Sequence, residues 1–165
     1  RQFLGDVEWG ELDYLIIDLP PGTGDASLSL AQALPLSGAV IVTLPQLVSL
    51  EDASRGLNMF KTLEVPILGI IENMSYLDLP DGTRMDLFGS GGGEQLAQAT
   101  QTTFLGKIPI DQNVRIGGDS GKPILVSHPE SPVANSLREI AHKVAAQVSV
   151  AALSTKNDLP INIVE

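Results

Sequence analysis

An aspartate at the end of a short apolar run is the first residue of this chain whose setting suggests chemistry. Asp18 follows the apolar residues 15–17, a pattern typical of a strand buried on both faces of a parallel sheet. The prolines and glycines of residues 20–24 then exclude regular structure, and Asp25 fits the N-cap of a following helix. Open α/β sheets bind their ligands where a strand ends in such a turn.

The chemistry available at this turn is that of a phosphate and a hard cation. The Asp18 carboxylate could face Mg²⁺ or its water shell, while the amides of Gly22, Thr23 and Gly24 could face a terminal phosphate. An ordinary turn that contains an aspartate explains the same residues, because Asp, Pro and Gly are all common in turns. The motif taken alone leaves both interpretations open.

Two further polar stretches follow strand-like or irregular segments. Asn73 lies near the end of the apolar run 66–74, and its amide can both donate to and accept from the edge of an adenine. A simple turn at the strand end is the alternative. The glycine-rich residues 89–93 could hold an anion on their amides before a helix, but they lack the Lys-Ser/Thr of a phosphate-binding loop, which favours a flexible helix start.

Alternating strands and helices must position these residues. We expect strands at residues 14–19, 39–43, 66–74 and 104–108, and helices at residues 25–34, 49–63, 94–99 and 131–148. Residues 108–123 read as a loop with at most one helical turn, and Asp81-Gly82 as a hairpin turn. The alternation predicts an α/β fold with a doubly wound, mostly parallel sheet, in one domain over residues 1–153 with a flexible tail at 154–165.

Composition narrows the class of protein. The 165 residues carry a net charge of −10, which disfavours nucleic acid and anionic membranes as partners. No apolar run reaches the length of a membrane-spanning helix, so we expect a cytoplasmic protein. Cysteine is absent, which excludes disulfides and thiolate metal ligands from this chain. The chain begins at Arg1 and reaches a buried strand at once, so we expect a cut inside a larger domain.

Several separate strings of the chain resemble one known family. The segments LIIDLPPGTGD, ENMSY, FGSGGG, FLGKIPID and IGGDSGKP occur in this order and together span nearly the whole chain. They are similar to the Mrp/ApbC proteins, which are iron–sulfur cluster carriers within the MinD/ParA-like group of P-loop NTPases. Agreement of this many strings in order is highly specific.

The resemblance implies a function and a set of roles. The parent protein would be a dimeric ATPase that binds ATP or ADP with Mg²⁺, holds a labile iron–sulfur cluster and passes it to apo iron–sulfur proteins. Asp18 would take the Walker B role and meet Mg²⁺ through water, and residues 22–24 would sense the γ-phosphate. Asn73 would read adenine, with Pro109 and Asp111 against the base and ribose.

The chain departs from the family pattern in two respects. The family's Walker A loop, GKGGVGKS or similar, is not in this sequence, so we expect a fold that is incomplete at the N-terminus, lacks a sheet neighbour and is inactive alone. Many members also carry C-x-x-C after ENMSY, where this chain reads YLDLPDGTRMD. Either the cluster ligands lie elsewhere, or the protein is a MinD/ParA-like nucleotide-dependent switch without a cluster.

Overall fold

A computed structural model describes residues 6–20 and 24–156. Its central sheet holds three parallel strands in the order β1 (Ala39–Thr43), β2 (Ile67–Glu72) and β5 (Phe104–Lys107). The described helices are α2 (Asp25–Ala33), α3 (Leu47–Thr62), α4 (Gly92–Ala99), α5 (Gln112–Ser120), α6 (Ile124–Ser127) and α7 (Pro132–Lys156), and β3 (Leu77–Asp78) pairs with β4 (Arg84–Met85) in an antiparallel hairpin. The predicted α/β fold with a parallel sheet is confirmed.

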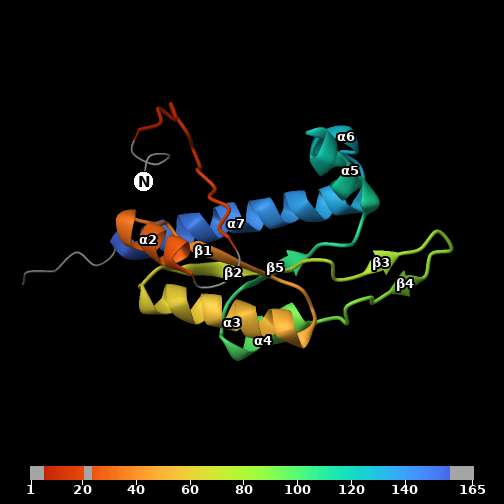
Figure 1. Ribbon diagram of the computed structural model, residues 1–165, viewed down its shortest axis with the longest axis horizontal. Coiled ribbons are helices and arrows are strands. Elements are labelled where there is room, and N and C mark those ends of the chain that lie inside the picture. The colour runs from red at the N-terminus through yellow and green to blue at the C-terminus, as the bar shows by residue number, and fades with distance from the viewer. Residues whose placement is uncertain (1–5, 21–23, 157–165) are drawn as a thin grey trace, which may run out of the picture.

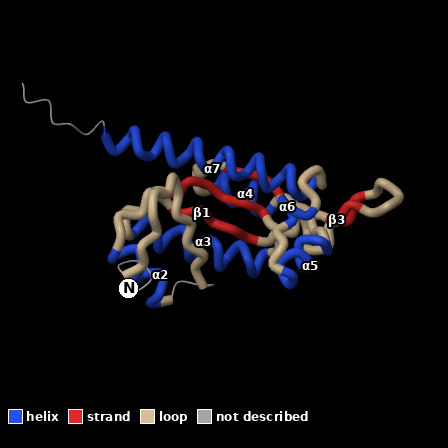
Figure 2. The backbone as a smooth tube through the Cα atoms, turned by 90° about the horizontal axis from the view of Figure 1, so that it is seen from above, coloured by secondary structure: helices blue, strands red, loops and turns tan. Residues whose placement is uncertain are grey.

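Helices cover both faces of the sheet, with α7 on one side and α3 and α4 on the other (Figure 1, Figure 2). Consecutive residues of β2 pack on opposite faces of the sheet. Ile70 packs in a cluster with Leu57 of α3, whereas Ile71 packs with Leu105 of β5 and Ile140 of α7. Because both faces of β2 are covered, its sequence is continuously apolar up to Glu72 instead of alternating.

The predicted strand at residues 14–19 is wrong for this structure. The segment has no regular secondary structure, and the Ile16 side chain is 89% exposed, although Leu19 packs at the margin of the core. A strand requires a neighbour for its backbone hydrogen bonds, and none of the described residues pairs with this segment. We expected a sheet that lacks a neighbouring strand, and β1 lies at an edge of the sheet, where it pairs with β2 alone among the described strands.

Two predictions about the C-terminal part also require correction. Residues 108–123 contain the helix α5, which is longer than the single turn we expected, and the short helix α6 follows directly after them. Asp111 caps α5, since its side chain accepts from the Asn113 amide at 2.8 Å, and Gly121 ends it at φ +68°. Helix α7 continues to Lys156 where we expected an end near residue 148, so residues 154–156 are helical and the rest of the predicted tail lies outside the described residues.

The hairpin β3–β4 turns at Asp81-Gly82, as predicted. The Gly82 amide donates to the Leu79 carbonyl at 2.9 Å, and Gly82 has φ +83°, a conformation that glycine adopts without strain. The Asp81 carboxylate accepts from the Thr83 hydroxyl at 2.6 Å and from the Thr83 amide at 2.9 Å. These bonds, the hydroxyl bond first, hold the pKa of Asp81 below its ordinary value.

The Asp81 pKa gives a testable prediction for the turn. Because folding lowers this pKa, the stabilisation is present above the pKa of the unfolded chain and is lost as the pH falls through the lowered value. Thr83→Val should raise the Asp81 pKa towards its ordinary value, whereas Thr83→Ser should keep it low. Titration of the Asp81 carboxyl carbon by NMR measures both variants. Equal pKa values in the two variants would contradict this assignment.

Candidate functional site

The carboxyl ends of the three parallel strands lie at one edge of the sheet, and two polar loops meet there. The Asn73 amide donates to the Thr43 carbonyl at 2.8 Å, which places the residue after β2 beside the end of β1. The Ser75 amide donates to the Ile108 carbonyl at 3.0 Å, and the Ile110 amide donates to the Tyr76 carbonyl at 2.7 Å. Residues 73–76 and 108–111 therefore run side by side, and Asn73 lies at the same sheet edge as Pro109 and Asp111.

Asn73 is half-buried, and its side chain is only partly used within the described structure. Its Oδ1 accepts from the Met74 amide at 2.9 Å, and no described residue accepts from its side-chain nitrogen. Met74 adopts φ +52°, which is uncommon for a non-glycine residue. The turn thus fixes the Asn73 side chain in one orientation and leaves its amide hydrogens available to a ligand.

Pro109 and Asp111, the two other residues predicted to contact the base and ribose, also contribute to the structure of the chain itself. Pro109 is buried, and the Asp111 carboxylate caps helix α5 as described above. Capping occupies one carboxylate oxygen, so the other oxygen remains for a ligand. Contact of either residue with a base or ribose stays a prediction.

Of the residues predicted to meet phosphate and Mg²⁺, the structure describes Asp18 and Gly24, and no described hydrogen bond joins either of them to this edge. Asp18 is exposed at the end of the irregular segment, and Gly24 is the exposed N-cap of α2, one residue before the predicted cap at Asp25. Gly22 and Thr23 lie outside the described residues.

Asp18 fits one part of a magnesium site. Its exposed carboxylate could hold Mg²⁺ directly or through water. Among the described residues, no group of three or more Asp, Glu, His or Cys side chains could hold a metal ion. Magnesium sites on nucleotides take most of their ligands from water and substrate phosphates, so a single protein carboxylate suits such a site.

Sequence reasoning missed the role of Glu72, the last residue of β2. Its side chain is 0% exposed, and its carboxylate accepts from the Gly93 amide at 2.7 Å and from the Ser75 hydroxyl at 2.8 Å. The glycine-rich residues 89–93 therefore direct amides at an internal carboxylate, and α4 begins among them at Gly92. An acidic residue inside an apolar strand was the available signal.

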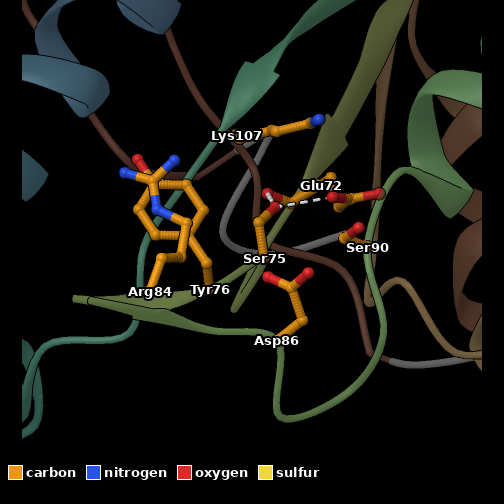
Figure 3. A pocket seen from close by; sticks show the side chains of 7 residues that line it. All are labelled: Glu72, Ser75, Tyr76, Arg84, Asp86, Ser90 and Lys107. Carbon is orange, nitrogen blue, oxygen red and sulfur yellow. Dashed lines mark hydrogen bonds between the residues drawn. The ribbon is translucent and has the colours of Figure 1, made fainter. Parts of the chain in front are cut away.

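A pocket of about 160 Å³ opens beside this carboxylate (Figure 3). The residues that line it are Glu72, Ser75, Tyr76, Arg84, Asp86, Ser90 and Lys107. The Arg84 guanidinium stacks on the Tyr76 ring at 3.5 Å from its centroid and binds Asp78 through Nε at 2.8 Å. These contacts hold the pKa of Arg84 above its ordinary value, chiefly through the hydrogen bond to Asp78. The pocket thus lies at the base of the hairpin, next to the sheet edge that carries Asn73.

Comparison with solved structures defines the class of protein. A nucleotide-binding protein from Archaeoglobus fulgidus, solved in complex with ADP, is 42% identical, and the alignment covers 79% of this chain and 53% of that one with a TM-score of 0.68. The cell-division protein MinD from Pyrococcus horikoshii, solved with Mg-ADP, has the same fold at 24% identity and a TM-score of 0.67, over 87% of this chain and 54% of that one. The fold is that of MinD-like P-loop NTPases.

Sequence comparison then defines the family. A family model described as NUBPL iron-transfer P-loop NTPase, of the ParA group, matches residues 1–145. An iron–sulfur cluster carrier protein from Synechocystis is 57% identical over 156 residues, 93% of this chain, and the iron–sulfur cluster transfer protein NUBPL from Dictyostelium discoideum is 47% identical over 151 residues, 91% of this chain. The chain belongs to this family of iron-transfer P-loop NTPases, which confirms the resemblance to the Mrp/ApbC carriers.

The chain spans less than half the length of these relatives, 44% of the Synechocystis protein and 47% of the Dictyostelium one. The activity of a whole relative therefore does not transfer directly to the residues present here. None of the described helices is long and apolar enough to cross a membrane.

Proposed function

We propose that this chain is the Walker B and base-binding part of an ATP-hydrolysing iron–sulfur cluster carrier. The observation that carries the proposal is the 57% identity, over 93% of the chain, to a protein named as an iron–sulfur cluster carrier. The ADP complex of the Archaeoglobus relative supports nucleotide binding. The meeting of residues 73–76 and 108–111 at the carboxyl edge of the sheet supports it independently, because open α/β sheets bind ligands at that edge.

Each predicted residue has a role in this proposal. Asp18 holds Mg²⁺ through water, and residues 22–24 contact the γ-phosphate of ATP. The Asn73 amide hydrogen-bonds to adenine, while Pro109 and Asp111 contact the base and ribose. Mg²⁺, when bound, neutralises charge on the phosphates.

The cluster is a cargo that this chain does not ligate through thiolates, because the chain has no cysteine. In many family members a C-x-x-C pair follows the ENMSY segment, where this chain forms the hairpin β3–β4. Cluster ligands then come from outside this chain, and apo iron–sulfur proteins are the clients. The missing thiolates favour a second candidate, a MinD/ParA-like switch whose nucleotide state controls partner binding.

A homodimer is part of the proposal for both candidates. Large apolar side chains are exposed near the carboxyl edge of the sheet and on the returning limb of the hairpin: Leu47, Val48, Met74, Met85, Leu87 and Phe88. Leu47 and Val48 are each 71% exposed. Exposed apolar residues gathered near one edge are typical of a surface that a partner covers.

Iron and acid-labile sulfide separate the two candidates. The full-length gene product is incubated anaerobically with ferrous iron, sulfide and a thiol reductant, desalted, and assayed for both elements. A carrier should retain iron and sulfide in equal stoichiometry and release them to an added chelator. A protein that binds Mg-ATP but retains neither element would contradict the carrier role and support the switch.

The chain alone is expected to turn over no Mg-ATP. A phosphate-binding loop with its lysine cradles the β- and γ-phosphates in P-loop enzymes, and these 165 residues contain no such motif. Release of inorganic phosphate from Mg-ATP by residues 1–165, compared with the same preparation carrying Asp18→Asn, measures this. Turnover that the substitution abolishes would show that the chain is catalytically complete and would contradict the prediction.

A further inference from the structure

Glu72 carries a fully buried carboxylate to which the proposed function gives no role. Both of its oxygens are occupied: Oε1 accepts from the Ser75 hydroxyl at 2.8 Å and from the Gly91 amide at 3.3 Å, and Oε2 accepts from the Gly93 amide at 2.7 Å. A buried charge is retained only where such hydrogen bonds replace water. We call Glu72, Ser75, Gly91 and Gly93 the Glu72 clasp.

The clasp joins the two ends of the segment that connects β2 to α4 and contains the hairpin β3–β4. After β2 the chain leaves the sheet, forms the hairpin β3–β4 and returns at the start of α4. Ser75 lies on the outgoing end, and Gly91 and Gly93 lie on the returning end, 19 and 21 residues from Glu72. In Figure 3 the side chains of Ser75 and Ser90 flank Glu72, and Asp86 points towards them from the hairpin side. One carboxylate therefore fastens both ends of the hairpin segment to the end of β2.

Two glycines at the start of α4 have no room for a side chain. A Cβ atom on Gly93 would lie 2.9 Å from the Glu72 Cβ, and one on Gly92 would lie 2.3 Å from the Pro45 carbonyl oxygen. Glycine at these positions allows the amides to approach the carboxylate. The close approach to the Glu72 carboxylate explains the glycine at position 93, whereas Gly91 is explained by its left-handed backbone at φ +76°.

The outgoing end of the clasp includes the turn that carries Asn73. Asn73 precedes the anchored Ser75 by two residues, and its own amide is bonded to the end of β1. Between them, Met74 has φ +52°, an unfavourable conformation that the surrounding bonds must maintain. If the hydrogen bond between Ser75 and Glu72 were lost, this turn would relax and the side-chain amide of Asn73 would change its orientation.

We propose that Glu72 is a positioning residue, which sets the orientation of the Asn73 amide for base recognition and ties that orientation to the hairpin through the clasp. The inference rests on the proposed function, because it takes Asn73 as the residue that reads adenine. Because the Glu72 side chain is 0% exposed, it acts through Asn73 in this proposal, so its loss should affect discrimination between bases and leave the binding of the phosphates unchanged.

Base discrimination in the full-length gene product tests the proposal. Dissociation constants for Mg-ATP, Mg-GTP and Mg-tripolyphosphate, which has no base, are measured for the wild type, Glu72→Gln and Asn73→Ala. Glutamine keeps the size of the side chain but presents an NH₂ group to an amide donor, which breaks one clasp bond. Both variants should lower the preference for ATP over GTP by roughly tenfold, the value of one well-placed hydrogen bond, with tripolyphosphate affinity unchanged.

Glu94→Gln is the matched control. Glu94 lies in the first turn of α4, the helix that begins beside the clasp, and forms a half-buried ion pair with Lys107, but it is not part of the clasp. Its substitution should leave the ATP preference at the wild-type value. Ser75→Ala, which removes one clasp bond without altering the buried charge, repeats the test if Glu72→Gln does not fold.

Hydrogen exchange of the hairpin amides separates failure of this proposal from failure of the proposed function. If the full-length protein binds no nucleotide, the proposed function fails, and the clasp is still tested by exchange at residues 77–90. Glu72→Gln should then accelerate exchange across the segment, while Glu94→Gln should not. An unchanged ATP preference in a nucleotide-binding Glu72→Gln protein, or unchanged hairpin exchange, would overturn the proposal.

Discussion

Replacing Asp18 by asparagine in the full-length gene product is expected to lower ATP turnover by roughly 100-fold or more, because stabilisation of phosphate charge by Mg²⁺ contributes several kcal/mol to such reactions. Asparagine has nearly the same shape but no charge, so it binds the metal or its water weakly. Because Asp18 is exposed and forms no described hydrogen bond, the fold should tolerate the change. Steady-state release of phosphate at saturating Mg-ATP measures the effect.

Asp13→Asn is the control for this substitution. Asp13 is also exposed and lies five residues earlier in the same irregular segment, so its substitution makes the same change of charge at a position without a proposed role. Turnover should remain within about twofold of the wild type, as is usual for a surface substitution. An equal loss of ATP turnover in the two variants would contradict the specific role proposed for Asp18.

Replacing Gly92 by alanine is expected to lower the free energy of unfolding by about 3 kcal/mol, the upper part of the range for overpacked sites. The added Cβ would lie 2.3 Å from the Pro45 carbonyl oxygen and 2.7 Å from Leu50 Cδ1, so the start of α4 would have to move away from α3. Backbone at Pro45 cannot yield as a flexible side chain can. Urea denaturation followed by circular dichroism measures the change.

Gly56→Ala is the control, and we expect it to raise the free energy of unfolding. Gly56 lies inside α3, and a Cβ at this position would meet no atom within 4 Å. Alanine is favoured over glycine in a helix interior by about 1 kcal/mol, so this variant should be more stable than the wild type. If Gly92→Ala unfolds at the same urea concentration as the wild type, the close packing of α3 against α4 is not as described.

Local sequence patterns correctly predicted the turns, whose hydrogen bonds form between nearby residues, and the strands that have a neighbouring strand in the sheet. The strand at Ala39–Thr43 and the turn at Asp81-Gly82 were predicted at the correct residues. The segment at residues 14–19 has an equally apolar pattern, but without a neighbouring strand it has nothing to pair with. Helix α5 was missed because Gly117 and Gly118 lower helix propensity, although the Asp111 cap and the left-handed Gly121 define its ends.

Part of the candidate site was predictable because it depends on the pairing of parallel strands. Asn73 and Pro109 each follow a strand, and parallel pairing brings the strand ends together, so their shared edge could be foreseen. The clasp could not be foreseen, because Glu72 meets Gly91 and Gly93 only after the chain has made the whole hairpin excursion. A glycine-rich stretch looks the same in sequence whether its amides hold a phosphate or a protein carboxylate.

Cluster transfer tests the central claim most directly. The full-length gene product, loaded with iron and sulfide and desalted, is mixed with an apo iron–sulfur protein, and loading of the acceptor is followed by its visible absorption. The carrier function predicts that the acceptor gains its cluster faster than from equal amounts of free iron and sulfide. Loading no faster than from the free ions, by a protein that hydrolyses Mg-ATP, would contradict the carrier function and leave the nucleotide-dependent switch.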